Sequence, residues 1–195
     1  MINLVDIRQQ KMNGVDDVEA IAAELWSFSL AFYDRAGVAA ALLALQDRFG
    51  LNVDLVLFAI WLGLSGRGQL DQRQADAAQR AVRPIELEVI EPLRAHRRRL
   101  KSVIDDDVQR LRESIKLLEI EAERVVLTRL AALAGPILQA DPELCLADAE
   151  ANLFFVVGSA EPTTRPAAII RRELRRLARA NSSAPTHLGP PHPSA

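Results

Sequence analysis

The stretch LNVDLVLFAIWLGL, residues 51–64, is the most apolar part of the chain. Its apolar residues fall on every side of a helix, which is typical of a helix that is buried on most of its surface. A membrane span takes ~20 residues, so the run is too short to cross a bilayer, and Asp54 interrupts it. The sequence therefore predicts a central core helix here, with Asn52 as its N-cap.

Two helices are predicted upstream of this core helix. Apolar residues recur at helical spacing over residues 16–34, where Asp16 is a suitable N-cap, and residues 1–15 are expected to be frayed. A second helix is predicted over 37–48, with Gly50 in the left-handed position that commonly follows a helix.

Downstream of the core helix, Asp71 is expected to begin the next helix. Pro84 suits the first turn of a new helix, and Pro92 predicts a kink or break within it. Two longer helices, 84–103 and 105–134, are expected to pack as an antiparallel or elbowed pair. The second carries a heptad-like seam that widens towards its end, and this favours a bundle helix over a lone coiled coil. The seam consists of Ile104, Val108, Leu111, Ile115, Leu118, Ala122 and Val125.

The C-terminal third is less regular. Residues 144–157 are apolar but ambiguous between helix and strand, and Pro166 opens a short helix to about residue 180. Residues 181–195 hold four prolines and no apolar periodicity, which predicts a disordered tail. We therefore expect an all-α protein, a compact irregular bundle of about six or seven helices, with a single domain over 16–180.

Composition sets limits on the class of protein. The chain has 195 residues, 49% hydrophobic and 5% aromatic, and a formal net charge of −2, which argues against a wholly basic nucleic-acid binder. The only cysteine, Cys145, has no intramolecular partner and fits a buried apolar position in a reducing compartment. Residues 1–14 lack the apolar run of a secretory signal, so a cytoplasmic protein is expected.

No catalytic, cofactor-binding or metal-binding set is predicted, which favours a non-enzymatic protein. Of the three histidines, His187 and His192 lie in the tail and His96 lies on an apolar stripe, where a partly buried structural role is expected. The acidic run 105–107 is explained by a helix N-terminus rather than by a magnesium–diphosphate site.

Two basic tracts are candidate contacts for an anionic partner such as nucleic acid. Residues 1–57 carry four basic and eight acidic side chains, so a solvated face or salt bridges to this acidic half is the simpler interpretation. Neither tract contains an aromatic residue for base stacking. The candidate residues are Arg94, Arg97, Arg98, Arg99 and Lys101 in the first tract and Arg171, Arg172, Arg175, Arg176 and Arg179 in the second.

A ligand pocket is the other candidate site. Trp26 and Trp61 lie on apolar helical faces and are either core residues or the walls of a pocket, with Asp47 or His96 as its polar group. Asp47 and its neighbour Gln46 are also candidates for a buried polar contact between helices.

Several unusual words occur in order along the chain, among them LWSFSLAFY (25–33), LLALQDRFGL (42–51), LFAIWLG (57–63), PLRAHRRRLK (92–101) and EIEAER (119–124). Over about residues 22–135 the chain resembles a family of small proteobacterial proteins known only as conserved hypothetical proteins with a domain of unknown function. The resemblance implies a bacterial, cytosolic, helical protein. It implies no activity, and no functional residue is carried over from it.

Three functions are compatible with these features. The leading one is a protein–protein interaction or adaptor module, most simply a homodimer or a partner complex through residues 104–130. The alternatives are nucleic-acid binding through helices 94–101 and 171–179, and a small-ligand carrier or enzyme with a pocket near the tryptophans. Attachment of the C-terminal basic helix to a membrane surface is a further alternative.

Overall fold

The computed structural model describes residues 4–158 and 164–182, and the side chains of 17–158 and 164–180. The predicted tail, 181–195, lies outside the described side chains. The described residues form helices and no strand, so the all-α prediction is confirmed. The elements are α1 (Leu4–Tyr33), α2 (Val38–Phe49), α3 (Val53–Leu64), α4 (Gln72–Ile85), the π-helical turn η1 (Glu86–Ile90), α5 (Glu91–Leu100), α6 (Asp106–Ala131), α7 (Pro142–Val157) and α8 (Arg165–Ser182).

Local capping signals set most of the predicted boundaries. Gly50 ends α2 with a φ of 66°, and Asn52 begins α3 by accepting a hydrogen bond from the Leu55 amide at 3.0 Å. Asp71 caps α4 in a full capping box, and Asp105 caps α6. The ambiguous segment 144–157 is helical and lies in α7.

Two boundaries differ from the predictions. The backbone of α1 is helical from Leu4, so Asp16 lies inside the helix and is not its N-cap. Pro84 does not open a new helix: it lies near the end of α4, which continues directly into η1 and α5. The π turn ends two residues before Pro92, which lies in the first turn of α5 and lacks a backbone N–H. Because α4, η1 and α5 are continuous, they count as one helical segment, and the described residues then form seven helices.

The core is arranged around α3, as predicted. One buried cluster packs Phe58, Trp61 and Leu62 against α4, α6 and Leu25 of α1, and a second packs α3 against α2, α7 and α8. Cys145 is buried. No single described helix is long and apolar enough to cross a membrane, although α1 from Asp17 and α2 pass that test together as a pair bent by 98°.

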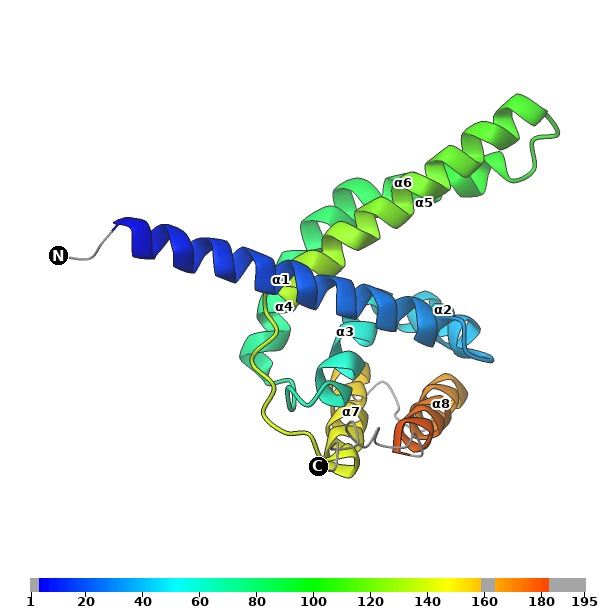
Figure 1. The fold of residues 1–195 in the computed structure, drawn as a ribbon. Coiled ribbons are helices and arrows are strands. Elements are labelled where there is room, and N and C mark those ends of the chain that lie inside the picture. Colours follow the sequence, from blue (N-terminus) through cyan, green and yellow to red (C-terminus); the bar gives the residue numbers. More distant parts are fainter. Residues whose placement is uncertain (1–3, 159–163, 183–195) are drawn as a thin grey trace, which may run out of the picture.

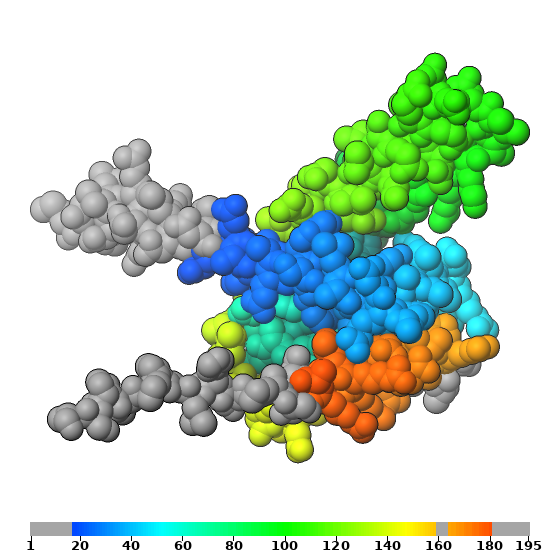
Figure 2. Space-filling view, turned by 45° about the vertical axis from the view of Figure 1, so that its right-hand side comes forward, coloured from blue at the N-terminus to red at the C-terminus, as the bar shows by residue number. Residues whose placement is uncertain are grey.

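Helices α5 and α6 run antiparallel and project from this core (Figure 1). We call α5, α6 and the turn between them the arm. In the space-filling view its outer half stands clear of the other helices (Figure 2). The side chain of Gln109 closes the turn by donating hydrogen bonds to the carbonyls of Leu100 and Val103, at 3.1 and 2.6 Å. The arm therefore presents much of its surface away from the core.

Candidate functional site

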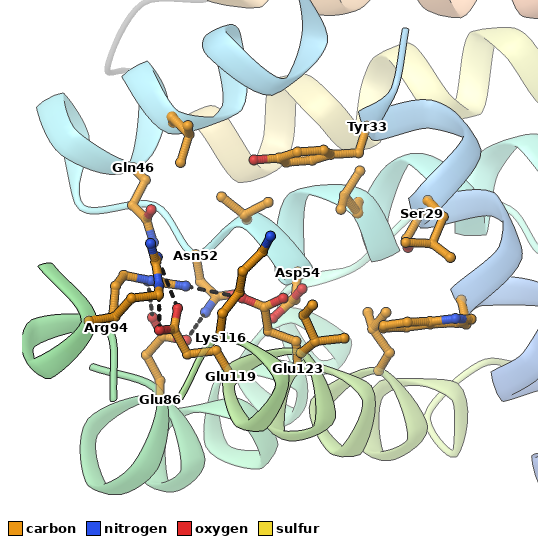
Figure 3. A pocket seen from close by; sticks show the side chains of 18 residues that line it. Ser29, Tyr33, Gln46, Asn52, Asp54, Glu86, Arg94, Lys116, Glu119 and Glu123 are labelled. Carbon is orange, nitrogen blue, oxygen red and sulfur yellow. Dashed lines mark hydrogen bonds and ion pairs between the residues drawn. The ribbon is translucent and has the colours of Figure 1, made fainter. Parts of the chain in front are cut away.

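A pocket of about 360 Å³ lies where the arm joins the core. Its walls come from α1, α2, the start of α3, η1, α5 and α6 (Figure 3). One wall is apolar and the other carries charged side chains. The apolar wall includes Trp26, Leu30, Leu43, Leu57, Ile120 and Leu127, and the charged wall includes Asp54, Glu86, Arg94, Arg97, Lys116, Glu119 and Glu123.

Arg94 organises the charged wall. Its guanidinium lies 3.6 Å from Glu86 and 3.2 Å from Glu123, so it joins the π turn to α6. The side chain of Asn52, which caps α3 with its oxygen, donates a hydrogen bond of 2.5 Å to Glu86 from its nitrogen. Burial raises the pKa of Glu86 and of Glu123, and the charge of Arg94 opposes the shift in both.

A second ion pair lies beside the first. Arg97 donates two hydrogen bonds to the buried Glu119, at 2.6 and 3.1 Å. These bonds raise the pKa of Arg97, while burial acts to lower it. This bidentate contact between a guanidinium and a carboxylate holds α5 against α6 at the edge of the pocket.

Asp54 differs from the other carboxyl groups because it has no partner. Only 9% of the residue is exposed, and none of the described residues donates a hydrogen bond to it or forms an ion pair with it. Burial raises the pKa of Asp54 well above its usual 3.8; the charges of Glu123 and Glu86 raise it further, while Arg94 lowers it. The hydroxyl of Ser29, 5% exposed on the α1 side of the pocket, also lacks a hydrogen-bond partner. The Ser29 hydroxyl is thus buried and unsatisfied, and the Asp54 carboxyl has no partner among the described residues.

A family model described as a protein of unknown function (DUF2390) matches residues 24–130. The chain belongs to this family. All the residues that line the pocket, from Trp26 to Leu127, fall within the part that matches DUF2390, whereas α7 and α8 lie outside it. No curated protein and no solved structure matches the chain.

The residues predicted for a pocket are dispersed in the structure. Trp26 lines the pocket, but Trp61 is buried in the core, where the Arg67 guanidinium lies 5.1 Å from its ring centre. Asp47 and His96 are exposed on the outer faces of α2 and α5. The predictions that His96 is partly buried and that Asp47 makes a buried polar contact were therefore wrong, because both helices turn these side chains to solvent. Gln46 lines the pocket.

The first basic tract is divided by its helix. Arg94 and Arg97 face the pocket and are paired with carboxylates, whereas Arg98, Arg99 and Lys101 are exposed on the outer arm. The side chains that sequence reasoning grouped as one basic patch thus have two different environments.

The second basic tract lies along α8 and is largely paired. Arg171 and Arg175 contact Glu150 of α7, and Arg172 and Arg176 contact Glu173. Although burial acts to raise it, these arginines hold the pKa of Glu150 and of Glu173 below the usual value. Arg35, in the turn between α1 and α2, also lies 3.4 Å from Glu173. The carboxylates that pair with Arg171, Arg172, Arg175 and Arg176 are thus those of α7 and α8, and not the predicted acidic residues before 57.

Sequence reasoning did not identify the carboxylates of the pocket. Asp54 is a charged residue within the most apolar run, and Glu119 and Glu123 have the i, i+4 spacing of one helical face. The charge within an apolar run and the i, i+4 pair are the sequence signals that could have indicated these carboxylates. Among the described residues no group of three histidine, cysteine or carboxylate side chains is placed to hold a metal ion.

Proposed function

We propose that this chain is a protein–protein interaction module and that its arm associates with the arm of a second copy. The family resemblance and the lone cysteine support placing this association in the bacterial cytosol. The observation that carries the proposal is a row of exposed aliphatic side chains on the arm, spaced seven residues apart.

The predicted heptad seam is split into two rows. Val108 and Ile115 are half-buried and Ala122 is buried where the arm packs on itself and on the core. The other row is exposed: Leu111, Leu118 and Val125 have 54%, 56% and 48% of their surface accessible. Ile104, seven residues earlier in the turn, is fully exposed. We call these four residues the arm stripe.

This spacing supports association with another helix. The contact seam of a coiled coil carries apolar side chains at two positions of each seven-residue repeat. Here one of these two rows packs within the molecule, and the other, the arm stripe, is exposed in the part of the chain that the structure describes. Helix α6 has 26 residues, so it extends for about 39 Å and offers a long surface for contact. A two-fold dimer is the commonest arrangement of identical chains, and it would bury the same stripe on both copies.

The test is the mass of the protein in solution, measured by light scattering across roughly a hundredfold range of concentration. We expect a dimer that dissociates on dilution. Leu118→Glu should abolish the dimer, because it would place a charge in the seam. Leu144→Glu is the matched control, since Leu144 is equally exposed, at 55%, but lies on α7. The proposal would be contradicted if the natural chain is a monomer at the highest concentration, or if Leu118→Glu and Leu144→Glu reduce the dimer equally.

A further inference from the structure

We propose that the pocket between α1, α3 and the base of the arm binds a small organic amine. Its ammonium group would lie at Asp54, and its apolar part would lie along Leu30, Leu43 and Ile120. This binding site is independent of the arm stripe, because none of the four stripe residues lines the pocket.

The pocket contains two buried polar residues that have no partner among the described residues. Asp54 and Ser29 are each more than nine-tenths buried, and both line the pocket. The Ser29 hydroxyl is unsatisfied, and no described residue pairs with the Asp54 carboxyl. Buried polar groups are normally hydrogen-bonded, so each exception calls for an explanation, of which a bound partner from outside the chain is one. An ammonium group supplies up to three donors, which both oxygen-bearing groups can accept.

The charged groups around the pocket also favour a cationic ligand. The pocket is lined by four carboxylates and three cations, so full ionisation would leave one excess negative charge. Arg94 is already shared between Glu86 and Glu123, and Arg97 is paired with Glu119. Lys116 is half exposed and contacts Glu113 instead. Asp54 is therefore the carboxyl group that lacks a positive partner, and a cationic ligand would supply it.

The lining of the pocket favours an organic cation over a metal ion. The carboxylates are not grouped in the way that a metal ion requires, as far as the described residues show. The opposite wall is aliphatic and aromatic, with Trp26 and Leu57 among its members, so it suits a carbon skeleton. A volume of about 360 Å³ lies near the lower end of the range for ligand pockets, ~300–1,000 Å³, which indicates a small molecule.

Binding of an amine should release a proton. Burial raises the pKa of Asp54, the charges of Glu123 and Glu86 raise it further while Arg94 lowers it, and an adjacent ammonium would lower it as well. The titratable and charged groups that face Asp54 across the pocket are Tyr33 from α1, Glu86 from η1, Arg94 and Arg97 from α5, and Lys116, Glu119 and Glu123 from α6. Calorimetry in two buffers of different ionisation enthalpy would measure the released proton.

The experiment compares three probes with similar apolar bodies on the full chain: phenethylamine, phenethyl alcohol and phenylpropionate. Ligand-observed NMR titrations at neutral pH give the affinities. We expect the amine to bind about tenfold more tightly than the alcohol, a difference of about 1.4 kcal/mol, and the carboxylate to bind most weakly. Equal binding of amine and alcohol, tighter binding of the carboxylate, or no binding of the amine would overturn the proposal.

Variants locate the site. Asp54→Asn should remove the preference for the amine over the alcohol, whereas Asp47→Asn should retain it, since Asp47 is exposed on α2. Ser29→Ala should weaken amine binding by a smaller factor. Retention of the preference in Asp54→Asn would overturn the assignment. Should that variant not fold, the comparison of the three probes on the natural chain still decides the question. Leu118→Glu, which tests the arm stripe, should bind the amine normally.

Discussion

At the scale of single residues, Asn152 connects α7 to the loop that follows α3. Its side chain is buried, accepts a hydrogen bond from the Leu70 amide at 2.6 Å and donates to the carbonyls of Ala59 and Gly68. Asn152→Ala would leave these buried groups unsatisfied, so we expect a loss of about 2–3 kcal/mol in the free energy of unfolding. Denaturant titration measures this loss. The exposed Gln72→Ala should change stability by less than about 0.5 kcal/mol, and equal effects of the two substitutions would contradict the account.

Asp54 makes stability depend on pH. Because its pKa is higher in the folded chain than in the unfolded chain, its contribution to stability is fully present below the unfolded pKa of about 3.9. That contribution is lost as pH rises through the folded pKa. Asp54→Asn should therefore match the natural chain near pH 4 and become progressively more stable than it above that pH, as measured by denaturant titrations. A variant that is less stable than the natural chain at neutral pH would contradict this.

At the scale of elements, the contact between α3 and α7 depends on Gly63. A Cβ atom at this position would overlap the backbone of Ala149 and Asp148, so only glycine permits the close approach. We expect Gly63→Ala to destabilise the protein by about 3 kcal/mol. Gly135→Ala is the control, because a Cβ there meets no atom within 4 Å. Thermal unfolding would distinguish the two variants, and a Gly63→Ala protein as stable as its control would contradict the packing.

The elements that sequence reasoning predicted best are those whose boundaries depend on adjacent residues. Gly50, Asn52, Asp71 and Asp105 act through their own backbone or through an amide about three residues away, so the sequence shows the signal directly. The prediction that Pro84 opens a new helix was wrong, because a proline near the end of a helix is also compatible with a helix that continues into a π turn.

The pocket could not be predicted because its residues come from six elements. Asp54, Glu86, Arg94 and Glu123 are far apart in sequence, and only the packing of the arm against α3 brings them together. The basic tract 94–101 was visible in the sequence, but the direction of each arginine depends on the carboxylates that α6 presents to it.

At the scale of the whole molecule, the two proposed roles belong to different parts of the arm. The base of the arm encloses the pocket, and its outer surface carries the arm stripe, so ligand binding and association use different residues. Leu118→Glu should therefore return the protein to a monomer without changing its thermal stability by more than a few degrees, because Leu118 is exposed. A variant that unfolds would indicate that the stripe is part of the core, which would contradict the account.

The most direct test of association through the arm is a paramagnetic NMR experiment on mixed chains. A spin label is attached at Ser114→Cys, an exposed position on α6, in a Cys145→Ala background, and the labelled chain is mixed with isotope-labelled chain that lacks the spin label. We predict that the amide signals of α6 and of the outer part of α5 broaden in the isotope-labelled copy. Absence of intermolecular broadening, or broadening confined to α7 and α8, would contradict association through the arm.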